Sequence, residues 1–127
     1  HKNGFTLAGR INKELKLISS SIIELGAIKI NKKNPHNNPD CEIDIIKMKN
    51  KSVILIDDVL NSGKTLIYAV KYILDVPLSK FNTSVLIDRN HKKFPIKIDF
   101  KGISLSTSIE ENVNVVFENN KSYAFID

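Results

Sequence analysis

The sequence predicts an α/β fold in which helices flank a mainly parallel sheet. Residues 53–56 form an uninterrupted aliphatic run, which is typical of a strand buried on both faces of such a sheet. Residues 66–74 carry the clearest helical periodicity of the chain, and residues 84–88 give a second buried strand. A strand, a helix and a strand joined by short connections form the unit from which parallel sheets are built.

Ahead of this unit the chain alternates between helical and extended patterns. Apolar residues recur at helical spacing across residues 4–18, and the serines at 19–21 end that helix. Residues 22–30 are predicted to form a strand, because apolar and polar residues alternate at its end. Residues 31–40 contain two prolines and four asparagines and are expected to form a loop, and a short edge strand is predicted at 42–46.

After the unit, the pattern indicates more strands. Pro77 closes the helix, and residues 96–100 alternate as a further strand. Residues 113–117 and 123–126 flank Asn119-Asn120, which predicts a C-terminal β-hairpin. The whole chain, residues 1–127, is therefore expected to form one domain.

The composition restricts the class of protein. The chain is 42% hydrophobic and 26% charged, which is typical of globular proteins and excludes disordered ones. A single cysteine, Cys41, excludes an internal disulfide and any four-cysteine metal site, and it favours a reducing, cytoplasmic setting. No apolar run approaches the roughly 18 residues that a membrane span needs, so no membrane partner is expected.

The net charge of +5 suits an anionic ligand, RNA or a solvated surface. Six lysines fall within one short stretch of the chain: Lys29, Lys32, Lys33, Lys47, Lys49 and Lys51. No aromatic residue lies within that stretch, so a platform that stacks single-stranded bases is not indicated. Two interpretations stay open, a solvated surface and an anion-attracting face.

The chemistry of the chain is concentrated in residues 53–65. Two adjacent acids, Asp57 and Asp58, follow the buried strand, and a short loop then leads into a helix. Ligands of open α/β sheets bind beyond the carboxyl ends of the strands, which is where these residues emerge. Backbone amides of residues 61–65 can bind a phosphate, while the acids can accept hydrogen bonds from the vicinal hydroxyls of a sugar. The pattern therefore suits a sugar phosphate.

This segment has two other interpretations. Gly-Lys-Thr also ends the nucleotide P-loop, but that motif needs a glycine five residues before Gly63, where Asp58 stands. The segment could instead be purely structural, with a polar strand end and a helix N-cap at Ser62 or Thr65. Side-by-side acids repel each other when no ligand or cation is bound, which disfavours this interpretation.

These residues resemble a known signature. Residues 53–65 are similar to the phosphoribosyl-pyrophosphate (PRPP) motif of type I phosphoribosyltransferases, in which an apolar strand, two acids, an apolar pair and a small-residue loop end in Gly-Lys/Arg-Thr. Residues 85–96 resemble the segment Val-Leu-Val-Asp-Arg-Gly-His-Arg-Glu-Leu-Pro-Ile of the bifunctional pyrimidine-operon regulator/uracil phosphoribosyltransferase family. Residues 99–102 and 107–108 continue the likeness, which covers roughly residues 1–110.

The resemblance implies an enzyme that uses PRPP and Mg²⁺ to ribosylate a nucleobase, a pyrimidine such as uracil, and that releases pyrophosphate. Asp57 and Asp58 would be its catalytic acids, which hold the ribose hydroxyls directly or through the magnesium shell. The expected PRPP-binding residues are Val59, Leu60, Asn61, Ser62, Gly63, Lys64 and Thr65. The expected pyrophosphate loop is Lys2, Asn3 and Gly4, and the residues expected near the base are Asp88 and Arg89. As an alternative, Arg89 and His91 are surface-loop residues.

The sequence departs from the family pattern at two places. Lys2 and Asn3 stand where relatives carry a Thr-Arg pair, so a bidentate guanidinium is missing there. Residues 31–41 are shorter than the family's mobile loop and hold Lys32, Lys33 and His36 in place of an Arg-Asp-Asp run. A poorer lid would exclude water less well and slow turnover. The helix and first strand that precede the pyrophosphate loop in relatives are expected to be missing from this chain.

Three functions therefore stay open. The leading hypothesis is a phosphoribosyltransferase that acts as a homo-oligomer, such as a dimer. The second is a nucleotide-sensing regulator of pyrimidine genes that binds RNA with weak or no turnover. The third is a ligand-binding domain that has lost its turnover.

Overall fold

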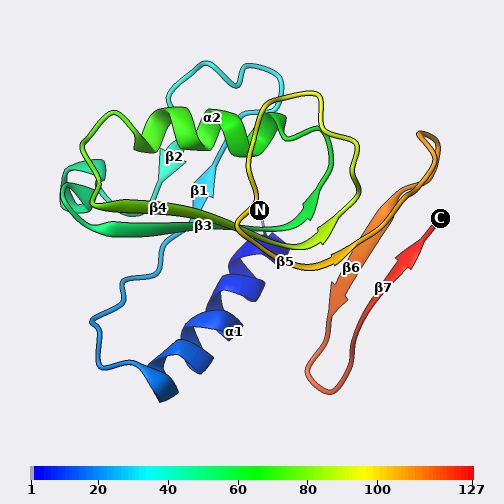
Figure 1. Ribbon diagram of the computed structural model, residues 1–127, viewed down its shortest axis with the longest axis horizontal. Helices are drawn as coiled ribbons and strands as arrows, with labels where there is room; N and C mark the ends of the chain where they lie inside the picture. The colour runs from blue at the N-terminus through cyan, green and yellow to red at the C-terminus, as the bar shows by residue number, and fades with distance from the viewer. Residues whose placement is uncertain (1) are drawn as a thin grey trace.

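The computed structural model describes residues 2–127, and its centre is a three-stranded parallel sheet in the order β3–β4–β5 (Figure 1). These strands are β3 (Ser52–Leu60), β4 (Lys80–Asp88) and β5 (Phe100–Ser104). The helices are α1 (Lys2–Ile18), α2 (Lys64–Ile73) and the short 3₁₀-helix η1 (Ile45–Met48). Two antiparallel pairs complete the fold, β1 (Ile28–Lys29) with β2 (Asp40–Cys41) and β6 (Val113–Phe117) with β7 (Ser122–Ile126). The predicted α/β class with flanking helices and a C-terminal hairpin is confirmed.

Helix α2 covers one face of the sheet because its apolar stripe meets β3 and β4. Leu66, Ala69 and Ile73 of α2 are buried, and they pack with Leu55 of β3 and Val85 of β4. Full burial of one large aliphatic side chain contributes about 1.5–3 kcal/mol, so this layer fixes the sheet and the start of α2 as one unit.

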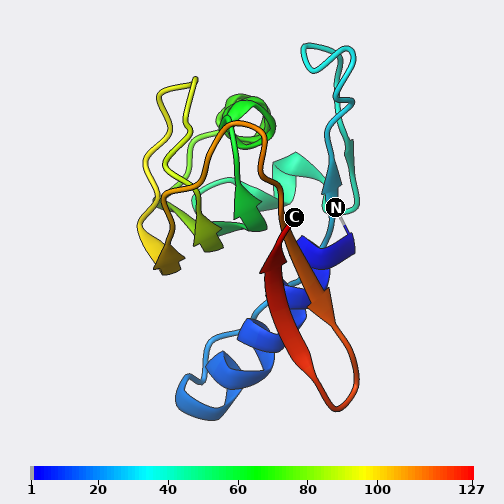
Figure 2. The same ribbon diagram turned by 90° about the vertical axis from the view of Figure 1, so that its right-hand side faces the viewer.

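Helix α1 lies on the opposite side of the sheet, and the β6–β7 hairpin lies beside it (Figures 1 and 2). The guanidinium of Arg10 stacks 4.7 Å from the ring centre of Phe117 and donates to the hydroxyl of Ser122 at 2.8 Å. The Asn3 amide donates to the Val115 carbonyl at 2.8 Å. These contacts join the first helix to a hairpin more than a hundred residues away in sequence.

Two strands predicted in the N-terminal half are wrong in extent. Residues 22–30 form a strand only at β1, because β2 offers a partner of just two residues. Residues 42–46 do not form an edge strand, since η1 begins within them. The Asp44 carboxylate accepts a hydrogen bond from the Ile46 amide at 3.0 Å, and this local bond stabilises a helical turn instead of an extended chain.

The strand predicted at residues 96–100 begins only at Phe100. Ahead of Phe100, hydrogen bonds that involve side chains replace the backbone hydrogen bonds between neighbouring strands. The Thr83 amide donates to the Asp99 carboxylate at 2.9 Å, and the Thr83 hydroxyl donates to the Lys97 carbonyl. The segment is therefore attached to β4 without adopting the regular strand pairing, which an alternating pattern cannot distinguish from a strand.

Gly63 makes the turn between β3 and α2 possible. Its backbone has a φ of +82°, in the region that only glycine adopts without strain. A Cβ at this position would also lie 2.8 Å from the Ile96 side chain. The requirement for glycine is thus set by the loop conformation and by the segment packed behind it.

We expect Gly63→Ala to lower the free energy of unfolding by about 1–2 kcal/mol, because alanine is strained at positive φ. The matched control is Gly9→Ala, in the interior of α1, where an added Cβ meets no atom within 4 Å. The control should raise stability by about 0.5–1 kcal/mol. Urea unfolding of the two variants checks this, and equal changes in both would contradict it.

Candidate functional site

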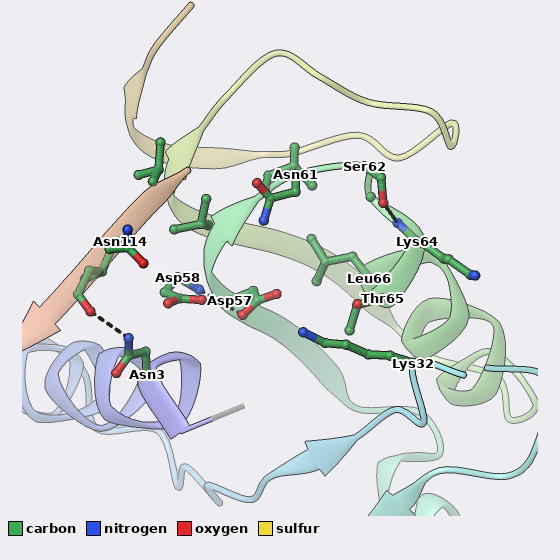
Figure 3. A pocket seen from close by; sticks show the side chains of 15 residues that line it. Asn3, Lys32, Asp57, Asp58, Asn61, Ser62, Lys64, Thr65, Leu66 and Asn114 are labelled. Carbon is green, nitrogen blue, oxygen red and sulfur yellow. Dashed lines mark hydrogen bonds between the residues drawn. The ribbon is translucent and has the colours of Figure 1, made fainter. Parts of the chain in front are cut away.

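The carboxyl ends of β3 and β4 meet at one edge of the sheet, where Leu60 pairs with Asp88. A cleft of about 370 Å³ opens there (Figure 3). It is lined by Asn3, Lys32, Asp57, Asp58, Val59, Leu60, Asn61, Ser62, Gly63, Lys64, Thr65, Leu66, Val113, Asn114 and Val115. Both acids and all seven residues of the predicted PRPP loop therefore line a single cavity.

The two acids stand inside β3 and not after it, because the strand continues to Leu60. Asp57 pairs in register with Val85, and its Oδ1 accepts a hydrogen bond from the Asp58 amide at 3.0 Å. Burial is the main reason that the pKa of Asp57 is raised to about 7, and the hydrogen bond and charge of the Asp58 carboxylate add to it. The acid pair is therefore poised to take up a cation or the hydroxyls of a ligand.

The start of α2 forms the opposite wall of the cleft. The structural N-cap is Gly63 and neither Ser62 nor Thr65, although the Ser62 hydroxyl accepts the Lys64 amide at 3.2 Å. The first amides of a helix have no acceptor within the helix, and the helix dipole makes its N-terminus attractive to anions. This wall is suited to binding a phosphate.

The predicted pyrophosphate loop is not a loop. Lys2, Asn3 and Gly4 form the first turn of α1, and only Asn3 lines the cleft. Gly4 is buried against the backbone of β3, where an added Cβ would lie 3.1 Å from an oxygen of Asp57. Residues 2–4 are thus part of a helix packed on β3, and their binding of pyrophosphate stays a prediction.

Sequence reasoning missed two parts of the cleft. Lys32, from the loop between β1 and β2, reaches into the cavity with its ammonium end directed toward Asp57 (Figure 3). Residues 113–115 of β6 form another wall. In the sequence, Lys32 is only one of several lysines of a loop, and nothing in the local pattern distinguishes it. The position of β6 at the sheet edge depends on contacts with residues distant in sequence, which a local pattern does not indicate.

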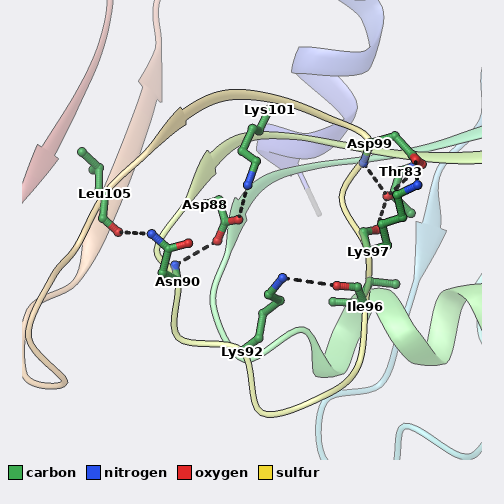
Figure 4. A network of polar contacts seen from close by, with 9 residues as sticks. All are labelled: Thr83, Asp88, Asn90, Lys92, Ile96, Lys97, Asp99, Lys101 and Leu105. Atoms are coloured by element: carbon green, nitrogen blue, oxygen red, sulfur yellow. Dashed lines mark hydrogen bonds and ion pairs between the residues drawn. The ribbon is translucent and has the colours of Figure 1, made fainter.

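Asp88 and Arg89 lie at the end of β4 but do not line the cleft. Asp88 is buried and accepts from the Lys101 ammonium at 3.0 Å and the Asn90 amide at 2.9 Å (Figure 4). Burial opposes its ionisation, but these two donors hold the pKa of Asp88 below its usual value. Arg89 is 7% exposed, so it is not a surface-loop residue, and His91 is half-buried with its ring bonded to the Thr107 carbonyl. The predicted place of Asp88 and Arg89 near the base stays a prediction.

The cleft offers two carboxylates to a metal ion. Among residues 2–127 no group of three or more histidine, cysteine, aspartate or glutamate side chains is arranged to hold a metal. Mg²⁺ commonly binds through one or two carboxylates together with substrate phosphates and water. Asp57 and Asp58 therefore fit Mg²⁺ that arrives with a phosphorylated substrate.

Comparison with known proteins agrees with this geometry. The sequence model of the phosphoribosyl transferase domain matches residues 1–119. The chain belongs to this family. It is 33% identical over 128 residues to the bifunctional protein PyrR of Latilactobacillus sakei subsp. sakei (strain 23K), covering 91% of this chain and 70% of that protein. It is 34% identical over 125 residues to the PyrR of Ligilactobacillus salivarius (strain UCC118), covering 88% of this chain and 68% of that protein.

Solved structures share the phosphoribosyltransferase fold. A hypoxanthine phosphoribosyltransferase from Staphylococcus aureus aligns with a TM-score of 0.59 and 19% identity over 74% of this chain and 52% of that chain. The Trypanosoma cruzi enzyme in complex with the product IMP aligns with a TM-score of 0.57 and 13% identity over 80% and 55%. The present chain thus spans about half the length of the chains in these solved structures. The predicted resemblance to type I phosphoribosyltransferases is confirmed.

We expect the stability of the ligand-free protein to fall as the pH rises from about 4 to about 7, through a contribution from Asp57. Its pKa is raised from 3.8 to about 7 in the folded protein, so the folded state holds an extra proton in this window. Asp57→Asn should make stability less dependent on pH. Urea unfolding at about pH 5 and about pH 8 checks this, and an identical pH dependence in variant and wild type would contradict it.

Proposed function

We propose that this protein transfers the phosphoribosyl group of PRPP to a nucleobase, a pyrimidine such as uracil, and releases pyrophosphate. The observation that carries the proposal is the single cleft that joins the acid pair of β3 to the helix N-terminus after it. An acid pair suits the hydroxyls of a sugar, and a helix N-terminus suits a phosphate. Membership of the phosphoribosyl transferase family supports the same conclusion.

Each wall of the cleft has a proposed role. Asp57 and Asp58 accept hydrogen bonds from the ribose 2′- and 3′-hydroxyls and hold Mg²⁺, which would neutralise charge on the pyrophosphate. Residues 59–65 bind the 5′-phosphate through backbone amides and the hydroxyls of Ser62 and Thr65. Asn3 supplies an amide group on the side of the cleft formed by α1.

The base is proposed to lie near the end of β4, as the family resemblance implies. The side chains of Asp88 and Arg89 are occupied by internal hydrogen bonds. Recognition of the base is therefore assigned to backbone groups near this strand end other than the Arg89 amide and the Asp88 carbonyl, which are bonded to Leu60 and Leu105.

The chemistry is a substitution at the anomeric carbon of the ribose. The bond to the pyrophosphate oxygen breaks, a ring nitrogen of the base forms the new bond and loses its proton, and the sugar carries positive charge between these events. Residues of this chain accelerate the step by holding the sugar and phosphate in place and by providing negative charge near the ring. Asp57 must be ionised for this role, so raising the pH through about 7 should favour it.

The test of this function is nucleotide formation from PRPP and uracil with Mg²⁺, followed by calorimetry of PRPP binding. We expect the wild type to form product and Asp57→Asn/Asp58→Asn to lose PRPP binding while it stays folded, because neutral amides replace the charged acceptors of the sugar hydroxyls and of Mg²⁺. Hypoxanthine and guanine replace uracil in parallel assays. Product from purines alone would refute the pyrimidine assignment, and unchanged PRPP affinity in the double variant would refute the site.

Lys32 is proposed to bind the pyrophosphate of PRPP. The lining of the cleft contains only two cationic side chains, Lys32 and Lys64, among residues 2–127. Figure 3 shows Lys64 directed away from the acids and Lys32 directed toward them. Lys32 therefore supplies the positive charge that Lys2 and Asn3 do not bring to the expected pyrophosphate loop.

We expect Lys32→Gln to raise the KM for PRPP about tenfold, which corresponds to about 1.4 kcal/mol. The matched control is Lys33→Gln, which removes the same charge one residue away, outside the lining of the cleft. The control should change KM little, because Lys33 lies outside the lining of the cleft and solvent screens its charge from the ligand. Equal effects of the two substitutions would mean that only net charge matters.

A second candidate function is RNA binding, which the family resemblance implies and a group of exposed lysines favours. Lys47, Lys49 and Lys51 are exposed. Lys47 lies on η1, Lys49 directly follows η1, and Lys51 directly precedes β3. The cleft lies at the other end of β3, so RNA at these lysines would leave it open. The alternative is that they only solvate this end of the sheet.

If these lysines bind RNA, affinity should fall as salt rises, because bound phosphates release counterions. Replacing all three lysines by glutamine should lower the log–log salt slope by up to about 3. Fluorescence anisotropy at about 50 mM and about 200 mM salt measures this. If no structured or single-stranded RNA binds at the lower salt, the enzyme function stands alone.

We also propose a cytoplasmic homodimer. Exposed apolar side chains on β5 and β7 (Phe100, Ile103 and Phe125) provide surface that a second copy could cover. Among residues 2–127 no helix is long and apolar enough to cross a membrane. The single cysteine, Cys41, agrees with a reducing compartment.

A further inference from the structure

Arg89 is a buried cation behind the phosphate wall of the cleft. Its Nη1 donates to the Asn61 side-chain oxygen at 2.7 Å, and its Nε donates to the Thr107 hydroxyl at 3.0 Å. Its Nη2 donates to the carbonyls of Ser108, at 3.2 Å, and Glu111. One guanidinium thus joins the phosphate loop to the turn at residues 107–111.

All of these partners are neutral oxygens. Among residues 2–127 no carboxylate lies within 4 Å of the Arg89 guanidinium. Burying a charge costs free energy, and a counterion normally compensates for it. If residue 89 only had to fill the protein interior, an uncharged side chain would stabilise the fold better. The geometry of its donors explains why an arginine stands here, since a planar fork can reach three segments at once.

The contact with Asn61 determines which end of that amide faces the cleft. A guanidinium can only donate, so the oxygen of Asn61 must face Arg89. The amino group of Asn61, which has two N–H donors, is then left for a ligand, and Asn61 lines the cleft. A donor at this place suits a phosphate oxygen.

The turn on the other side of Arg89 leads directly into β6, whose residues 113–115 also line the cleft. Arg89 therefore supports two of the cleft walls from behind without entering the cleft itself.

We propose that Arg89 is a positioning residue that holds the Asn61 amide as a hydrogen-bond donor to a phosphate of PRPP; this rests on the function proposed above. The role is distinct from a contact of the Arg89 side chain with the base. It predicts that Arg89 acts on PRPP affinity through Asn61.

The experiment is a double-mutant cycle of Arg89→Gln and Asn61→Ala, read by calorimetry of PRPP binding with Mg²⁺ at a temperature where circular dichroism shows every variant folded. We expect each single substitution to weaken PRPP binding about tenfold. The double variant should be no weaker than Asn61→Ala alone, because Arg89 has nothing left to position. Lys16→Gln is the control, since it removes one positive charge from the exposed last turn of α1, outside the lining of the cleft, and it should bind PRPP normally.

Arg89→Lys separates position from charge, because lysine keeps the cation but loses the planar fork. It should bind PRPP as weakly as Arg89→Gln. Full affinity in Arg89→Lys, additive losses in the cycle, or unchanged affinity in Asn61→Ala would each overturn the inference. The last outcome applies even if the Arg89 variants do not fold. Absence of PRPP binding to the wild type would overturn the proposed function itself.

Discussion

Neighbouring strands of a parallel sheet finish at the same edge, and the pairing of β3 with β4 uses this constraint to build the site. Because Leu60 lies opposite Asp88, the loop after β3 and the loop after β4 emerge side by side. The guanidinium of Arg89 can then reach Asn61 across a short gap. A shift of this ladder by one residue would turn each side chain of β3 to the opposite face and would carry Asn61 away from Arg89.

The layers on the two faces of the sheet hold this edge in different ways. Helix α2 is fixed by apolar burial, and its first turn consequently points at the cleft. Helix α1 packs so closely on the strand backbone that a Cβ at Gly4 would force a neighbouring atom to shift, and this packing encloses Asp57. The burial that completes the fold therefore also raises the pKa of Asp57. The packing of α1 on β3 thus affects both the stability of the fold and the ionisation of the site.

Local patterns were sufficient to predict β3, α2, β4 and the hairpin, because their residues are buried or turn at regular spacing. They also predicted that the two acids and residues 61–65 would lie together at the end of β3, where all of them line the cleft. They failed where a side chain decides the backbone path, as Asp44 and Asp99 do, and where partners are distant in sequence. Lys32 and residues 113–115 join the cleft only through tertiary contacts, so no spacing rule could assign them.

The hydrogen bond from Asn3 to Val115 bears on how this protein is made. The cleft takes walls from the first turn of α1 and from β6, which are separated by almost the whole length of the chain. During synthesis the phosphate wall and the acids leave the ribosome long before β6 does. The nascent chain must therefore keep an unfinished cavity until β6 arrives, and contacts of such long range slow folding.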